Sequence, residues 1–234
     1  MPAARQPMRL GRQHVELMRR AIDDPGPQLL DGFRPATDAD YEENVAGMLE
    51  SRPPGPFWIF AYGSLIWRPE TAFEERRAAT ARGWHRRFCL GWDYRYRGSR
   101  ETPGLMMALD RGGQCRGALY RLPEDSLTAE LHRLIRREMS MVPSAFPWRW
   151  IDTVCEDQPV RALVFAMDRR SPRYIAGLDD EALADILATA CGHRGSMCEY
   201  LFETVTALED MGIHDHRLWR LQDLVARRIE ARGS

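Results

Sequence analysis

One carboxylate in this chain of 234 residues falls where a helix should carry apolar side chains. The segment 126–139 has apolar residues at helical spacing, namely Leu127, Leu131, Leu134 and Ile135. Glu138 follows Leu131 by seven positions and Leu134 by four, which at about 100° per residue places it near the centre of that apolar stripe. Burial opposes ionisation and raises the pKa of a carboxyl group, which suits a general acid/base working near neutral pH.

Two simpler arrangements also fit this spacing. Either Glu138 lies beyond the buried part of the helix, or it pairs with an internal arginine. The three arginines around it, Arg133, Arg136 and Arg137, are expected to project away from the apolar stripe. An acid/base role therefore needs a second feature that could receive a substrate.

That second feature is the turn Tyr62-Gly63-Ser64-Leu65, which directly follows the apolar run 57–62. A glycine permits a turn with φ > 0, and successive free backbone N–H groups at such a turn can receive a carboxylate. Ser64 adds a hydroxyl donor. The surrounding residues match neither a P-loop nor a nucleophile elbow. An ordinary turn at the end of a strand remains the alternative.

Together these features resemble the ChaC-like γ-glutamylcyclotransferase family. The family's aromatic strand and turn appear at 60–67, and its helix ending in Arg-Glu appears at 134–138. Further segments in the family's order lie at 82–89, 97–99, 103–105, 115–121, 174–178 and 199–201. The resemblance covers about residues 57 to 222, most of the chain.

The resemblance implies a lyase that cleaves glutathione to 5-oxoproline and Cys-Gly. Its substrate carries its own nucleophile, the glutamyl α-amine, so no metal or other cofactor is implied. Glu138 would be the general acid/base, and Tyr62, Gly63, Ser64 and Leu65 would bind the glutamyl group. Arg97 would bind a second substrate carboxylate and Tyr200 would donate a hydrogen bond, although a purely structural role fits each of these two equally well.

Two other functions stay open. Before 199–201 the family often carries a glycine and an asparagine, where this chain has Gly195-Ser196-Met197-Cys198. If this segment lines the substrate pocket, the first alternative is an enzyme whose substrate is another γ-glutamyl amino acid or amine. The second alternative is a regulatory binding protein on the same scaffold, without turnover.

The order of the expected strands and helices that must position these residues predicts an α+β fold. It is expected to be a mixed, mostly antiparallel β-barrel or sheet with flanking helices, spanning a catalytic domain at 57–234. Residues 1–56 are expected to form a helical N-terminal extension. Strands are expected at 57–62, 80–90, 104–109, 116–120, 148–155 and 160–167, with a hairpin at Gly112-Gly113. Helices are expected at 13–22, 37–51, 126–139, 180–189, 197–210 and 216–227.

The composition and charge of the chain limit the classes of partner that it is expected to bind. A formal net charge of -1 favours neither nucleic acid nor an anionic membrane. The five cysteines form no C-x-x-C pair and are expected to be buried thiols in a reducing compartment. The N-terminus has no apolar signal-peptide core and no stretch is long enough to span a membrane, which predicts a cytoplasmic protein that binds a small molecule. His214 and His216 lack a third ligand, so no metal site is expected. The sequence does not predict the oligomeric state.

Overall fold

The computed structural model describes residues 7–27 and 30–233, and the chain divides into two compact units. One unit, called here the barrel unit, comprises Pro27–Leu90 and Met107–Tyr174. The other, the helical unit, comprises Met1–Gly26, Gly91–Met106 and Ile175–Ser234. The turn at 62–65 and Glu138 belong to the barrel unit, whereas Arg97 and Tyr200 belong to the helical unit.

Five strands close into a barrel in the order β2-β4-β3-β6-β7. They are β2 (Trp58–Ala61), β3 (Glu75–Asp93), β4 (Gly104–Arg121), β6 (Trp148–Cys155) and β7 (Gln158–Phe165). β2 runs antiparallel to β4 and parallel to β7, and β6 runs antiparallel to both β3 and β7. The predicted α+β fold with a mixed, mostly antiparallel barrel is confirmed.

The short strand β2 lies in the interior of the barrel unit. All four of its residues are buried, as an uninterrupted apolar run predicts for a strand covered on both faces. Its Ile59 pairs with Tyr120 of β4 on one side and with Leu163 of β7 on the other. The core therefore holds the strand that delivers the turn at 62–65.

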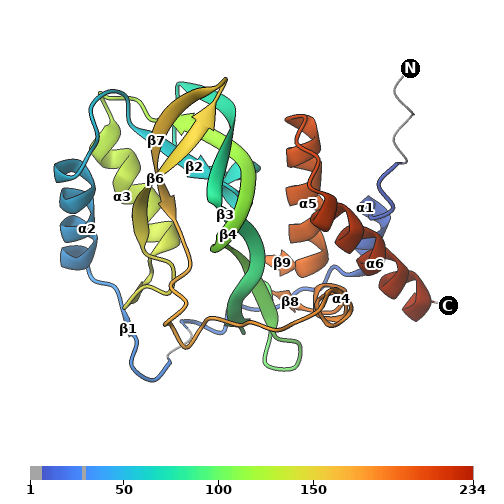
Figure 1. Ribbon diagram of the computed structural model, residues 1–234. Helices are drawn as coiled ribbons and strands as arrows, with labels where there is room; N and C mark the ends of the chain where they lie inside the picture. The colour runs from blue at the N-terminus through green and yellow to red at the C-terminus, as the bar shows by residue number, and fades with distance from the viewer. Residues whose placement is uncertain (1–6, 28–29, 234) are drawn as a thin grey trace, which may run out of the picture. The chain divides into compact units, whose positions relative to one another are not determined.

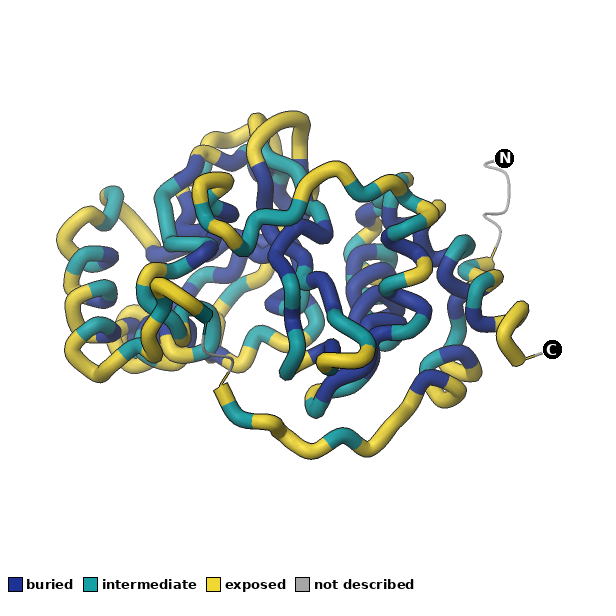
Figure 2. Tube along the Cα trace, turned by 90° about the horizontal axis from the view of Figure 1, so that it is seen from below, coloured by how far each residue is buried: buried dark blue, intermediate teal, exposed yellow. Residues whose placement is uncertain are grey.

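Two helices complete the barrel unit, α2 (Asp38–Glu50) and α3 (Leu127–Glu138), and they pack against each other (Figure 1). Thr37 caps α2 as predicted: its Oγ1 accepts a hydrogen bond from the Asp40 amide, and the Asp40 carboxylate accepts one from the Thr37 amide. The apolar stripe of α3 is buried along its length. Figure 2 shows buried positions alternating with exposed ones along the helical segments of the chain.

The predicted hairpin at Gly112-Gly113 was wrong. Both glycines lie inside the continuous strand β4, with φ of 105° and 68°. Positive φ values at adjacent glycines let a strand bend as a β-bulge does, so the pair does not reverse the chain here. The connection between β3 and β4 lies instead at residues 94–103.

The described part of the helical unit contains the helices α1 (Arg12–Leu17), α4 (Asp180–Leu187), α5 (Met197–Asp210) and α6 (His216–Gly233). α6 packs against α1, α4 and α5. The helix predicted at 13–22 ends five residues early. Beyond α1 the chain follows tertiary contacts, among them the ion pair of Asp24 with Arg95, which override a weak helical preference.

Four two-residue strands and a 3₁₀ turn were not predicted. β1 (Arg34–Pro35) pairs with β5 (Met141–Val142), and β8 (Cys191–Gly192) pairs with β9 (Gly195–Ser196). The 3₁₀ turn η1 (Ser64–Ile66) directly follows the glycine of the 62–65 turn. Such short elements leave no periodic pattern in a sequence.

The predicted extension at 1–56 supplies residues to both units. Its helix α1 belongs to the helical unit, whereas β1 and α2 belong to the barrel unit. The boundary at residue 57 stays a prediction. Within residues 7–27 and 30–233, no helix is both long and apolar enough to cross a membrane.

Candidate active site

The turn after β2 is built from backbone hydrogen bonds. Gly63 leaves the strand with φ -135° and ψ -131°, so the positive φ expected for it is not used. The Ile66 amide donates to the Gly63 carbonyl at 2.9 Å, and the Arg68 amide donates to the Ser64 carbonyl at 2.8 Å. The amides of Ser64 and Leu65 precede the first bond within η1, which is the position where a helix-like turn offers N–H groups to an acceptor.

Two buried side chains hold this turn from the barrel interior. The buried guanidinium of Arg86 donates through Nη1 to the Tyr62 carbonyl at 2.9 Å. The hydroxyl of Tyr120 donates to the Ile66 carbonyl at 3.0 Å. Tyr62 and Leu65 are themselves buried. The position of the turn is therefore fixed at both ends by β3 and β4.

Glu138 is the last residue of α3, and its side chain is 16% exposed. Burial is the largest influence on this carboxyl group and raises its pKa. The negative charge of Glu70 acts in the same direction, while the adjacent Arg137 opposes the rise without cancelling it. The result is a mostly buried carboxyl group that exchanges a proton closer to neutral pH than an exposed glutamate does.

Arg137 connects this carboxylate to the turn. Its Nε lies 2.9 Å from Oε1 of Glu138, and its Nη2 donates to Oγ of Ser64 at 3.1 Å. Nη1 donates to the carbonyl of Arg68 and lies 3.5 Å from Oε2 of Glu70. The sequence predicted that Arg137 projects away, which was wrong, because its long side chain folds back at the end of the helix and is only 18% exposed.

The structure thus joins two features that the sequence analysis had found separately. Ser64 of the turn and Glu138 of α3 lie 74 positions apart and contact one guanidinium in the same unit. Burial and pairing with an arginine were offered as opposing explanations of Glu138, and both occur. Arg137 and Arg86 were not among the functional residues predicted from the sequence. Adjacency to Glu138 was the available signal for Arg137, and the position of Arg86 within the family-like segment 82–89 was the signal for Arg86.

Arg97 and Tyr200 lie together in the helical unit. The guanidinium of Arg97 stacks over the ring of Tyr200 at 5.8 Å from its centroid. Its Nη1 pairs with Oε2 of Glu199 and donates to the Ser196 carbonyl at 3.2 Å. Both Arg97 and Tyr200 are buried. Arg97 therefore already has a carboxylate partner within the chain, and its predicted contact with a substrate carboxylate stays a prediction.

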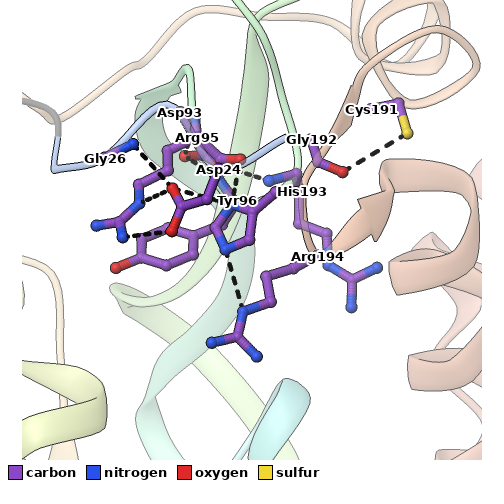
Figure 3. Close-up of polar contacts among 10 residues, drawn as sticks. Asp24, Gly26, Asp93, Arg95, Tyr96, Cys191, Gly192, His193 and Arg194 are labelled. Carbon is purple, nitrogen blue, oxygen red and sulfur yellow. Dashed lines mark hydrogen bonds and ion pairs between the residues drawn. The ribbon is translucent and has the colours of Figure 1, made fainter. Parts of the chain in front are cut away.

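The loop that carries Arg97 is tied to the β8–β9 hairpin (Figure 3). The amides of His193 and Arg194 donate to the carbonyls of Arg95 and Tyr96 at 3.0 and 2.8 Å. The carboxylate of Asp24 accepts two hydrogen bonds from the Arg95 guanidinium, both at 2.7 Å. An N-terminal segment and a C-terminal hairpin thus position the same loop of the helical unit.

Met197 and Cys198, where the chain departs from the family pattern, are both fully buried at the start of α5. All five cysteines are free and buried, as predicted. In the part of the chain that the structure describes, no three His, Cys, Asp or Glu side chains are grouped to hold a metal ion. His214 hydrogen-bonds Glu209, with Nδ1 2.6 Å from Oε1.

The family model of ChaC-like proteins matches residues 57–228. The chain belongs to the ChaC-like family. The matched region of this ChaC-like chain begins at the residue where the main domain was predicted to begin, and it includes the turn at 62–65 and Glu138.

Relatives of this ChaC-like chain carry one activity in their names. The glutathione-specific gamma-glutamylcyclotransferase of Escherichia coli (strain K12) is 40% identical over 177 residues, which cover 75% of each chain. The glutathione-specific gamma-glutamylcyclotransferase 1 of Homo sapiens is 31% identical over 179 residues, covering 74% of this chain and 79% of the human one.

A solved structure supports the fold. The crystal structure of the selenomethionine-labelled gamma-glutamyl cyclotransferase specific to glutathione from yeast superposes with a TM-score of 0.66 at 19% identity. The superposition covers 73% of this ChaC-like chain and 96% of the yeast chain. At this identity the likeness establishes the γ-glutamylcyclotransferase fold.

Proposed function

We propose that this protein is a γ-glutamylcyclotransferase that cleaves glutathione to 5-oxoproline and Cys-Gly. The observation that carries the proposal is the mostly buried carboxyl group of Glu138, with its raised pKa, joined through Arg137 to Ser64 of the turn. This arrangement occurs in a chain whose E. coli and human relatives are named for the same reaction on glutathione.

The reaction requires one carboxylate and a folded substrate. The α-amine of the γ-glutamyl residue attacks its own γ-carbonyl carbon, which forms the lactam C–N bond and breaks the amide C–N bond to cysteine. Glu138, as the carboxylate, takes a proton from the attacking nitrogen and then gives a proton to the departing nitrogen. No water is consumed, and holding the amine against the carbonyl supplies a large part of the rate enhancement.

The turn at 62–65 supplies the groups that hold the glutamyl end. The N–H groups of Ser64 and Leu65 lie at the start of η1 and suit an anionic oxygen, either of the substrate α-carboxylate or of the developing tetrahedral centre. Ser64 Oγ accepts a hydrogen bond from Arg137, so its own proton is free to be donated to the substrate. The buried Arg86 and Tyr120 keep these groups in place.

Arg97 and Tyr200, which both belong to the helical unit, are proposed as further residues that contact the substrate. Arg97 would bind a second substrate carboxylate only by sharing its guanidinium with Glu199, and Tyr200 would donate from its hydroxyl. The partner is a small γ-glutamyl peptide, with no cofactor, no nucleic acid and no membrane. We place the protein in the cytoplasm because its five cysteines are buried free thiols, which suits a reducing compartment.

A broader substrate range is the second candidate. Where the family often carries a glycine and an asparagine before 199–201, this chain has Gly195-Ser196-Met197-Cys198, a departure that favours a pocket open to other γ-glutamyl amino acids or amines. The fully buried side chains of Met197 and Cys198 would act on such a pocket only through the packing of α5. A regulatory protein without turnover would have no use for Glu138 as an acid/base.

The test follows both products. Purified protein is incubated with reduced glutathione, and 5-oxoproline and Cys-Gly are measured by mass spectrometry beside the Glu138→Gln variant. Equal amounts of both products, lost in the variant, would support the proposal. Absence of product from glutathione but release of 5-oxoproline from another γ-glutamyl compound would favour the broader range. Binding without product would point to the regulatory alternative.

A further inference from the structure

The guanidinium of Arg137 contacts several polar groups around Glu138. It contacts four groups from three parts of the chain: the Glu138 carboxylate, the Ser64 hydroxyl, the Arg68 carbonyl and the Glu70 carboxylate. An arginine that merely covered a helix end would project into water, whereas this side chain is 18% exposed. Its planar fork allows these contacts at once, which an ammonium group does not.

The contact with Ser64 fixes the direction of a proton. A guanidinium only donates hydrogen bonds, so Ser64 Oγ must be the acceptor from Arg137. The Ser64 proton then points away from Arg137 and is available to an acceptor in front of the turn. The same guanidinium holds Glu138 Oε1 at 2.9 Å. One side chain therefore orients a donor of the turn and the acid/base together.

Glu70 is a second carboxylate that contacts the guanidinium of Arg137. It lies in the segment after η1, with its backbone in the left-handed region at φ 53°, and its Oε2 is 3.5 Å from Nη1 of Arg137. Its other oxygen is 2.6 Å from Nε of Arg68. The charged groups that influence Glu138 are thus Arg137 from its own helix and Glu70 from the segment that follows the turn, and Glu70 itself pairs with Arg68.

We infer that Arg137 is a positioning residue for the cyclisation, shared between Glu138 and Glu70, which holds the acid/base and the Ser64 hydroxyl in one arrangement. This inference rests on the proposed function in taking Glu138 as the acid/base. The two neighbours of Glu138 act on its ionisation in opposite directions. Arg137 favours the carboxylate and lowers the pKa of Glu138, whereas Glu70 disfavours the carboxylate and raises that pKa.

The variants Arg137→Gln and Glu70→Gln test the arrangement. With ¹³C-labelled protein, the side-chain carboxyl resonance of Glu138, assigned by its loss in Glu138→Gln, is followed as a function of pH. We expect the pKa of Glu138 to rise in Arg137→Gln and to fall in Glu70→Gln. Arg136→Gln is the matched control, because Arg136 lies on the same helix and pairs with the exposed Asp38, and it should leave the resonance unchanged.

Activity gives the second readout. The acid limb of kcat/KM should move to higher pH in Arg137→Gln and to lower pH in Glu70→Gln, and kcat of Arg137→Gln should fall about 10²-fold. Arg137→Lys keeps the charge but not the fork, so the pKa of Glu138 should stay near its original value while kcat still falls. Full kcat in Arg137→Lys would overturn the role of Arg137 in orienting Ser64.

The two readouts separate the inference from the proposed function. If the original chain releases no 5-oxoproline while the Glu138 pKa moves in opposite directions in the two variants, the proposed function fails and the charge arrangement stands. If the original chain is active but both variants leave the pKa unchanged, or move it in the same direction, the inference is overturned. Circular dichroism of each variant establishes that it is folded.

Discussion

Helix α3 carries two inward-facing carboxylates, Glu130 near its start and Glu138 at its end, and their surroundings differ. Glu130 accepts hydrogen bonds from the Thr71 hydroxyl at 2.8 Å and the Ala72 amide at 2.9 Å. Its other oxygen accepts from Arg133 at 2.7 Å. Burial alone would raise the pKa of Glu130, but these donors outweigh it, and its pKa is lowered. Glu138 has Arg137 as its ion-pair partner, and its pKa is raised.

The difference shows that burial alone does not identify an acid/base. The side chain of Glu130 is 4% exposed and that of Glu138 is 16% exposed, so Glu130 is at least as buried as Glu138. What distinguishes the two is the supply of donors: three donors hold Glu130 as a carboxylate, whereas Glu138 has fewer and faces Glu70 as well. Glu130 therefore ties α3 to the segment before β3, and Glu138 remains able to exchange a proton.

Removing the carboxylate of Glu138 should have the largest effect on turnover. Because one group both takes and gives the proton, Glu138→Gln is expected to lower kcat with glutathione about 10³-fold. Glu130→Gln is the matched change on the same helix, and it should leave kcat of the folded protein within a few-fold. Steady-state release of 5-oxoproline measures both variants.

The assignment of the acid/base to Glu138 is contradicted if Glu130→Gln shows the loss expected of Glu138→Gln. A folded Glu130→Gln protein that loses turnover, beside an active Glu138→Gln protein, would move the acid/base to the other end of α3. Equal losses in both variants would mean that the assay reports the packing of the helix. Both outcomes are read against circular dichroism spectra of the two proteins.

Stability should respond in the opposite sense. Glu130→Gln places an amide N–H₂ against donors, which should lower the free energy of unfolding by about 1–3 kcal/mol. Glu138→Gln removes a carboxylate that burial disfavours, and Arg137 keeps its contacts with Glu70 and the Arg68 carbonyl. We therefore expect Glu138→Gln to unfold at equal or higher urea concentration than the original chain at pH 8, while Glu130→Gln unfolds at lower concentration.

The pH dependence sharpens this contrast. Glu130 has a depressed pKa in the folded state, so its contribution to stability is present above the pKa of the unfolded chain and is lost as the pH falls through the folded pKa. Glu138 has a raised pKa, so its carboxyl group costs stability as the pH rises from the unfolded pKa through the folded one. Urea titrations from about pH 3 to pH 8 should therefore give both differences their largest size at the higher pH, with opposite signs.

The same pair of residues shows how far the sequence could lead. Periodicity placed Glu138 on the apolar face of its helix, but Glu130 follows Leu127 by three positions and precedes Leu134 by four, so the same argument applies to it. The donors that separate them, Thr71 and Ala72, lie almost sixty positions earlier. No local pattern indicates contacts made across such a distance. The role of Arg137 was hidden for the opposite reason, because a side chain at a helix end can fold back.

The fold was predictable for those elements whose own sequence pattern is enough to determine their secondary structure. The strand β2, the capped helix α2 and the amphipathic helix α3 appeared close to their predicted bounds. The failures came where tertiary contacts decide: α1 ends at Leu17, and Gly112-Gly113 bends β4 instead of reversing the chain. The division into two units was not predictable either, since each unit is assembled from segments that are distant in sequence.

A second arginine–carboxylate pair, Arg97 with Glu199 in the helical unit, extends the comparison. If Arg97 also binds a substrate carboxylate, Arg97→Lys should raise KM for glutathione about 10-fold with little change in kcat, because a charged hydrogen bond is lost in ground and transition state alike. The exposed Arg100→Gln variant is the control. An unchanged KM together with a lower free energy of unfolding would assign Arg97 to structure alone.

The smallest expected effect comes from a single donor to Glu130. Thr71→Val removes the hydroxyl at 2.8 Å and leaves the Ala72 amide and Arg133 in place, so the free energy of unfolding should fall by about 1 kcal/mol. Losing one donor should also raise the pKa of Glu130 slightly, without reaching the condition of Glu138. Urea unfolding and kcat with glutathione are the measurements, and kcat should not change. A loss of turnover in Thr71→Val would mean that Glu130 and Glu138 are coupled along α3 and do not act as two separate carboxylates.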